Sequence, residues 1–201
     1  MSPLRDSPDS RQRRQLLGLL GAAAALRAVP AVADAGARDG VAPPPEVARH
    51  LPGAMRVGEG RYTYFGFSVY EASLWSATPV PEQRWWEADF ALSLRYARSL
   101  RGAAIAERSI EEMKRQAAVS DVQQHTWLAW MRGAFPDVRA GDRIMGLYRQ
   151  PDRCEFFYRG RATAQVSDAE FARLFFGIWL SPRTSAPDLR AALLGLPPGA
   201  A

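Results

Sequence analysis

The clearest hydrophobic pattern in the chain is a strict alternation between positions 88 and 97. One side of this stretch carries large apolar residues and the other carries small or polar ones: Phe90, Leu92, Leu94 and Tyr96 against Ala91, Ser93, Arg95 and Ala97. Alternation with a period of two is typical of a β-strand with one buried face. The pattern therefore predicts a half-buried strand, with Arg95 and Tyr96 on opposite sides of it.

Further strands are indicated by β-branched and aromatic residues on both sides of this stretch. Glycines at 58 and 60 favour a turn, after which residues 61–70 are rich in Tyr, Phe and Val and predict a strand continuing to Trp75. Later in the chain, three apolar stretches separated by Gln150-Pro151-Asp152 and Arg159-Gly160 predict a meander of strands at 142–149, 153–158 and 162–166.

The period changes to that of a helix in four places. Residues 103–116 predict an amphipathic helix, and Ser120 is a suitable cap for a second one that ends near Gly133. Ser167 or Asp168 can cap a third helix that reaches Trp179. Asp188 can cap a last short helix, 189–194, with Gly195 ending it. This element order predicts an α+β fold in which helices cover one face of a largely antiparallel sheet.

The amino-terminal segment has the features of an export signal. Arg13-Arg14 precede an apolar run from Leu16 to Leu26, which is too short to span a bilayer but suits a signal peptide. Small residues at Ala31 and Ala33 favour cleavage after Ala33. The paired arginines favour twin-arginine export, with an ordinary secretory signal as the alternative. We therefore expect a periplasmic protein: signal peptide 1–33, linker or irregular start 34–54, and one domain over 55–196.

Charge and composition exclude several classes of function. The chain has a net charge of +5, but residues 1–33 hold five arginines and two aspartates, so most of the excess lies in the leader. This argues against a nucleic-acid partner. The two histidines, His50 and His125, lie in different predicted elements, and the single cysteine, Cys154, lies in a predicted strand as a packed residue. We therefore expect neither a metal site nor a cofactor.

Two residue pairs have an ordinary structural interpretation. Glu111-Glu112 is predicted to lie on the solvated face of a helix rather than to act as an acid and base pair. Trp85-Trp86 is predicted to pack at the start of a strand, with an exposed recognition patch as the alternative.

Four strings in order resemble the chalcone isomerase-like family. Gly66–Trp75 resembles its G-x-x-V-Y-x-A-x-L strand, and Leu94–Arg98 followed by Gly102 resembles the next strand and the start of a helix. Residues 135–142 resemble the P-x-V-x-x-G-D motif. Residues 168–180 resemble the D-x-x-F-A-x-x-F-F-G-I-W-L block of the bacterial exported branch. The resemblance covers about residues 55–195 and implies an open-faced β-sandwich with a cleft between the sheet and the helices.

The resemblance implies two different functions. Plant chalcone isomerases use a strand arginine, a threonine, a tyrosine at a helix start and a hydroxyl residue in the last inter-helix turn. Arg61 and Thr184 match the first and last of these, whereas the threonine falls near Phe65 and the tyrosine near Ile105. A hydroxyl that polarises a carbonyl cannot be replaced by Phe or Ile. Non-catalytic relatives bind fatty acids, with an arginine and a tyrosine facing the carboxylate.

We therefore expect a non-catalytic protein that binds a fatty acid or a similar small amphiphile. The candidate ligand-binding residues are Arg61, Arg95, Tyr96, Arg98 and Thr184. The alternatives are an isomerase or lyase acting on a chalcone-like enone, and a structural or partner-binding protein of the envelope that uses Trp85-Trp86. Oligomeric state is left open.

Overall fold

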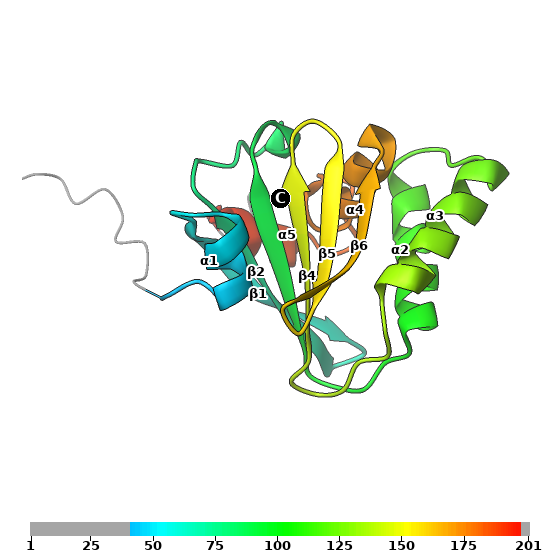
Figure 1. Ribbon diagram of the computed structural model, residues 1–201, viewed down its shortest axis with the longest axis horizontal. Helices are drawn as coiled ribbons and strands as arrows, with labels where there is room; N and C mark the ends of the chain where they lie inside the picture. Colours follow the sequence, from blue (N-terminus) through cyan, green and yellow to red (C-terminus); the bar gives the residue numbers. More distant parts are fainter. Residues whose placement is uncertain (1–40, 198–201) are drawn as a thin grey trace, which may run out of the picture. The chain divides into compact units, whose positions relative to one another are not determined.

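The structure is a computed structural model that describes residues 41–197, and Figure 1 shows its elements. They follow in the order α1 (Pro45–His50), β1 (Met55–Tyr64), β2 (Phe67–Ser76), the 3₁₀ turn η1 (Trp85–Glu87), β3 (Phe90–Tyr96), α2 (Gly102–Gln116), α3 (Asp121–Ala134), β4 (Arg143–Arg149), β5 (Arg153–Tyr158), β6 (Arg161–Ser167), α4 (Ala169–Leu180) and α5 (Pro187–Leu194). The six strands form one antiparallel sheet in sequential order. The predicted α+β fold is confirmed.

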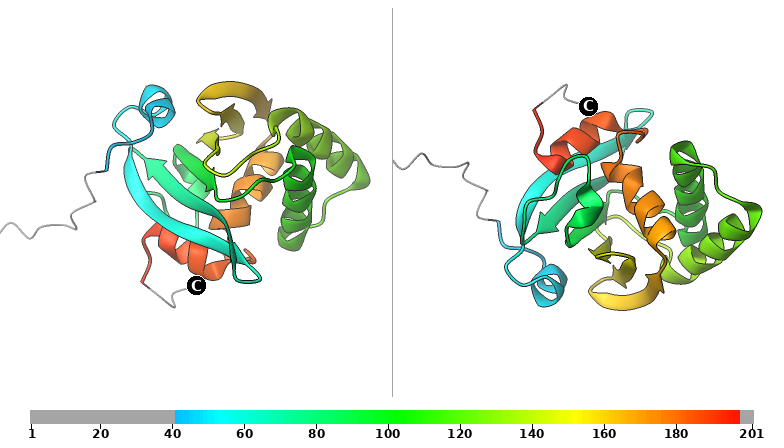
Figure 2. Two further views of the ribbon diagram at one scale, coloured as in Figure 1. Left: turned by 90° about the horizontal axis from the view of Figure 1, so that it is seen from below. Right: turned by 90° about the horizontal axis from the view of Figure 1, so that it is seen from above.

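The two faces of the sheet bury different residues. The alternation of β3 sends Phe90, Leu92, Leu94 and Tyr96 into the large core beneath α2–α5, while Ala91 joins a smaller cluster on the other face. Helix α1 closes that second face, where Val47 and Leu51 pack against Trp75 and neighbouring residues. Figures 1 and 2 show α1 on the side of the sheet away from α5. The described part of the segment expected to be a linker thus contains a short packed helix.

The predicted single strand from Arg61 to Trp75 is wrong, because the chain reverses in its middle. Phe65 and Gly66 have φ values of 47° and 78° and form the turn of a β1–β2 hairpin, in which Tyr62 lies opposite Tyr70. Two successive positive φ values are typical of a tight hairpin turn, where Asn or Gly is the usual first residue. Phe65 occupies that position instead, so the residue types gave no indication of a turn.

The turn expected at Gly58 and Gly60 is absent, since both glycines lie inside β1. Helix α5 crosses the strand there, and a Cβ on Gly58 would lie 2.0 Å from the carbonyl oxygen of Ala192. The missing side chain therefore serves close packing of a helix on a strand.

The helix caps largely follow the prediction. Ser120 and Gln123 form a capping box at α3, and the Asp168 carboxylate accepts the backbone N–H groups of Glu170 and Phe171 at α4. The second Asp168 oxygen accepts the indole N–H of Trp127 at 3.0 Å, which joins α3 to α4. Helix α5 instead begins at Pro187, before the expected cap Asp188, because proline suits a first helical position.

The predicted signal segment, 1–33, lies outside the described residues. Within residues 41–197, no helix is long and apolar enough to cross a bilayer. Cys154 is buried as expected, and burial raises the pKa of its thiol. Trp85 is also buried, and Trp86 is covered by the Arg173 guanidinium 3.9 Å above its ring. The alternative of an exposed patch at Trp85-Trp86 is therefore wrong.

Candidate ligand-binding site

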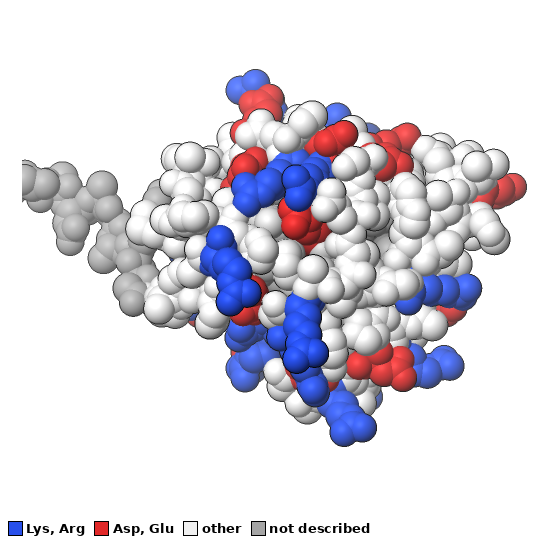
Figure 3. Space-filling model, in the orientation of Figure 1, with Lys and Arg blue, Asp and Glu red and all other residues white. Residues whose placement is uncertain are grey.

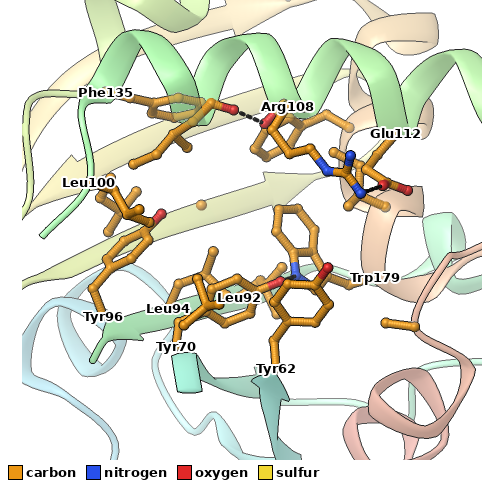
Figure 4. A pocket seen from close by; sticks show the side chains of 18 of the residues that line it. Tyr62, Tyr70, Leu92, Leu94, Tyr96, Leu100, Arg108, Glu112, Phe135 and Trp179 are labelled. Carbon is orange, nitrogen blue, oxygen red and sulfur yellow. Dashed lines mark hydrogen bonds and ion pairs between the residues drawn. The ribbon is translucent and has the colours of Figure 1, made fainter. Parts of the chain in front are cut away.

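A cavity of about 340 Å³ lies between the sheet, α2 and α4. Its wall is mostly apolar and aromatic, and Figure 4 shows these side chains converging from strands below and from helices above and beside them. The apolar and aromatic lining residues are Tyr62, Tyr64, Val69, Tyr70, Leu92, Leu94, Tyr96, Leu100, Ile105, Phe135, Ile144, Phe156, Phe175, Phe176, Ile178 and Trp179. A cavity of this size and lining is typical of sites for small apolar molecules.

The cavity exists because α2 stands away from the sheet. Helix α2 packs mainly on α3 and α4, whereas α4 and α5 pack on the strands. The first turn of α2 is held by Asp137, whose carboxylate accepts the backbone N–H of Gly102 at 2.9 Å. Leu100 and Val138 pair through two backbone hydrogen bonds just before it. These contacts hold α2 above the strands without filling the space below.

Tyr70 is part of the cavity wall with its hydroxyl already occupied. That hydroxyl accepts the indole N–H of Trp179 at 3.1 Å, and the ring stacks on Tyr62 with a centroid separation of 5.1 Å. Burial raises the pKa of Tyr70 well above its usual value. Tyr70 therefore stays protonated and links β2 to α4.

Tyr96 presents a free hydroxyl to the cavity. The residue is buried and lines the cavity, yet its hydroxyl makes no hydrogen bond with any other described residue. Burial raises the pKa of this phenol above its usual range. Tyr96 can therefore donate a hydrogen bond to a ligand at any physiological pH.

The three charged residues of the lining differ in how they are paired. Arg108 Nη2 lies 2.5 Å from Oε1 of Glu112, and its Nη1 lies 3.0 Å from Glu111, so its charge is already balanced. The carboxylates raise the pKa of the Arg108 guanidinium, although burial acts in the opposite direction. Arg98, by contrast, is exposed at the cavity and has no ion pair or hydrogen bond among the described residues. Arg98 is therefore the available cation for an anionic ligand.

Tyr96 and Arg98 are the two predicted site residues that the structure brings together at the cavity. Arg61 and Arg95 lie on the opposite face of the sheet, where they pair with Glu71 at 3.1 and 2.5 Å and lower its pKa. Thr184 lies outside the lining: its hydroxyl donates to the carbonyl of Ile178 at 2.6 Å and stabilises the turn before α5. Arg95 and Tyr96 point to opposite sides, as the alternation predicts.

Five further residues line the cavity although the sequence did not predict them there: Tyr62, Tyr70, Trp179, Arg108 and Glu112. The two tyrosines face each other only because of the unrecognised hairpin. Glu112 was expected on a solvated face together with Glu111, but its side chain is 6% exposed against 64% for Glu111. The four-residue spacing of Arg108 and Glu112 on a helix was the signal that could have indicated their pairing.

Comparison with known proteins agrees with this architecture. The sequence model of the family described as "Chalcone isomerase-like" matches residues 57–195. An uncharacterised protein of Haemophilus influenzae is 31% identical over 139 residues, which cover 69% of this chain and 67% of that protein. The crystal structure of a fatty-acid binding protein of Arabidopsis thaliana is similar with a TM-score of 0.57 and 11% identity, over 71% of this chain and 87% of that chain. The chain therefore belongs to the chalcone isomerase-like family.

Proposed function

We propose that this protein is an exported, non-catalytic binder of a fatty acid or a similar amphiphile, which it holds in the cavity beneath α2. One observation carries the proposal: an apolar cavity whose wall includes a buried phenol, Tyr96, and an exposed guanidinium, Arg98, neither of which pairs with another described residue through its side chain. A carboxylate can accept from both groups, and a contact with a guanidinium is charge-assisted. The hydrocarbon chain of the same ligand would lie along the aromatic wall.

The burial of the hydrocarbon chain supplies most of the binding energy in this proposal. About ten methylenes at ~0.8 kcal/mol each contribute roughly 8 kcal/mol. Association costs about 4–15 kcal/mol in lost freedom. Because these two energies are of similar size, the hydrogen bonds to the carboxylate decide the net affinity. We therefore expect Arg98 and Tyr96 to have a large effect on the dissociation constant.

The family and the fold support a lipid ligand. The structural neighbour is a fatty-acid binding protein, and a sheet with helices on one face is what the two chains share. The cavity of this chain supports an apolar ligand as well, since Leu92, Leu94 and Phe156 are among its lining residues.

The chemistry of the cavity favours binding over catalysis. Ile105, at the position where the family's enzymes carry a tyrosine, lines the cavity as an apolar side chain. Phe65, at the position of their threonine, is exposed at the hairpin turn. A tyrosine with a raised pKa, such as Tyr96, keeps its proton at neutral pH and suits a donor of hydrogen bonds better than an acid or base.

Native mass spectrometry of the purified protein, followed by titration with palmitate, tests the proposal. We expect a co-purified lipid mass and a micromolar or tighter dissociation constant. Arg98→Gln should weaken palmitate binding by about ten- to a hundredfold, since a hydrogen bond to a charged group contributes ~1.5–3 kcal/mol. Tyr96→Phe should weaken it about threefold to tenfold.

Arg61→Gln is the matched control, because it removes an arginine that pairs with Glu71 on the other face of the sheet. Its palmitate affinity should equal that of the unmodified protein. Absence of both a bound lipid and a titration signal would refute the lipid ligand. Turnover of a chalcone that depends on Arg98 or Tyr96 would refute the non-catalytic role, and recovery of an uncleaved leader in the cytoplasm would refute export.

A further inference from the structure

The turn of the β1–β2 hairpin carries three exposed aromatic side chains. Tyr64, Phe65 and Phe67 are 52%, 83% and 66% exposed. They make up three of the seven large hydrophobic residues that are exposed within residues 41–197, and they lie within four positions of one another. A cluster of this kind on a protruding turn is unusual for a surface in contact only with water.

The backbone conformation of Phe65 is unfavourable for a phenylalanine. Its φ of 47° lies in the left-handed region, which disfavours a bulky side chain and favours Asn or Gly. Its ring packs edge-on against the ring of Tyr64, with a centroid separation of 4.5 Å, and 83% of the residue is exposed. Neither the local backbone nor the packing of the hairpin therefore accounts for a phenylalanine at this position.

The same end of the sheet carries more arginines than acidic residues. The β1–β2 turn, the loop after β3, the loop before β4 and the β5–β6 turn all lie at this end, because consecutive strands are antiparallel. Residues 61–71, 95–102, 136–143 and 158–162 together carry eight arginines and three acidic residues. Glu46 of α1 also reaches this end, where it pairs with Arg143 at 3.2 Å, so the net charge is +4. Figure 3 shows basic side chains outnumbering acidic ones over the lower part of the face it presents.

Part of the cavity opening lies beside the hairpin. The exposed residues of the lining include Tyr64 and Arg98 at this end of the sheet, as well as Arg108 on α2 and Ser185 before α5. The aromatic turn and the arginines thus share one end of the molecule with the part of the opening at Tyr64 and Arg98.

We propose that this end docks on the surface of an anionic lipid bilayer, with Phe65 and Phe67 inserted at the level of the headgroups. Aromatic side chains partition favourably into the bilayer interface, and arginines pair with lipid phosphates. The charge complementarity, together with aromatic rings at a strained turn, favours a bilayer over a protein partner. Docking in this orientation turns the opening at Tyr64 and Arg98 toward the membrane, so that an amphiphile can move between the bilayer and the cavity without crossing bulk water.

A fluorescent label on the turn tests the insertion directly. The native thiol Cys154 is buried, so a cysteine introduced at an exposed position can be labelled selectively. The test compares Phe65→Cys, labelled with a polarity-sensitive dye, with Val122→Cys on α3 as the matched control, since Val122 is also exposed. With vesicles of phosphatidylglycerol and phosphatidylethanolamine, the emission from position 65 should shift to the blue and that from position 122 should not.

Flotation with the same vesicles tests the contribution of the side chains and charges. Phe65→Asn combined with Phe67→Ser should weaken vesicle binding at least tenfold, while Val122→Ser leaves it unchanged. Binding should fall as salt rises and should be weak on phosphatidylcholine alone. Palmitate titration of the hairpin variant should be normal, which separates this proposal from that for the cavity.

Three outcomes would overturn membrane docking. The first is no blue shift at position 65, and the second is an equal shift at positions 65 and 122. The third is a shift that depends on protein concentration in the absence of vesicles, which would assign the turn to contact with a second copy of the chain.

Discussion

The indole N–H of Trp179 donates a 3.1 Å hydrogen bond to the hydroxyl of Tyr70 in the wall of the cavity. The two residues are 109 positions apart, and their bond joins the central helix α4 to the hairpin strand β2. The bond satisfies the indole N–H in an apolar wall. The hydroxyl of Tyr96, on the neighbouring strand β3, has no such partner among the described residues.

Tyr70→Phe should therefore destabilise the fold. The substitution leaves the indole N–H of Trp179 without its partner, and an unsatisfied buried donor costs about 1–3 kcal/mol. Tyr62→Phe is the control, because the Tyr62 hydroxyl makes no hydrogen bond with another described residue and its ring stays stacked on Tyr70. In urea unfolding, the free energy of unfolding should fall clearly for Tyr70→Phe and change by less than ~0.5 kcal/mol for Tyr62→Phe. Equal losses would contradict a role for the hydrogen bond.

Glu112→Gln should strengthen fatty-acid binding. The carboxylate of Glu112 balances the charge of Arg108 at the cavity, so its removal increases the positive potential that a ligand carboxylate meets. We expect palmitate affinity to rise about threefold or more. Glu111→Gln, at an exposed position that also pairs with Arg108, should have a smaller effect because solvent screens its charge. A fall in affinity for Glu112→Gln would show that the carboxylate itself contacts the ligand.

Asp142 should contribute stability that is lost at acid pH. Its carboxylate accepts hydrogen bonds from the backbone N–H of Arg139 at 2.8 Å, from the guanidinium of Arg159 at 2.7 Å and from the hydroxyl of Tyr158 at 2.9 Å. These bonds lower the pKa of Asp142 below its unfolded value of 3.8. The stabilisation is therefore complete above that value and disappears as pH falls through the lower, folded pKa.

Asp142→Asn checks this dependence. At pH 7 the variant should be less stable by about 2 kcal/mol, and the difference from the unmodified protein should shrink below about pH 4. Urea midpoints measured from pH 7 down to pH 2.5 give the comparison. A difference that stays constant over this range would mean that the charge of Asp142 is not involved.

Gly58→Ala should displace α5 from β1. The added Cβ would meet the Ala192 carbonyl oxygen at 2.0 Å, and such overpacking costs about 1–3 kcal/mol. Gly133→Ala in α3 is the matched control, since a Cβ there meets nothing within 4 Å. It should stabilise the protein by about 0.5–1 kcal/mol, because alanine is the better helix former. The midpoint temperature of thermal unfolding should thus fall for Gly58→Ala and rise for Gly133→Ala.

Local signals predicted most of the elements to within one or two residues. The alternation around Phe90–Tyr96, the cap at Ser120 and the cap at Asp168 each depend on neighbouring residues, so they are visible in the sequence. The hairpin was missed because Phe65 adopts a backbone conformation that its residue type disfavours. The glycines of β1 were misinterpreted because their role depends on helix α5, which lies far from them in the sequence.

The features of the candidate site also divide into those that local sequence determined and those that depend on tertiary packing. By itself, the sequence determined the family resemblance, the apolar face of β3 and the opposite directions of Arg95 and Tyr96, because side-chain direction along a strand follows from local geometry. Only the tertiary structure decided which arginine is available: Arg61 and Arg95 lie beside Glu71, Arg108 lies beside Glu112, and Arg98 has no such partner among the described residues. Pairing of charges depends on distances between elements, and those distances are set by how the helices pack on the sheet.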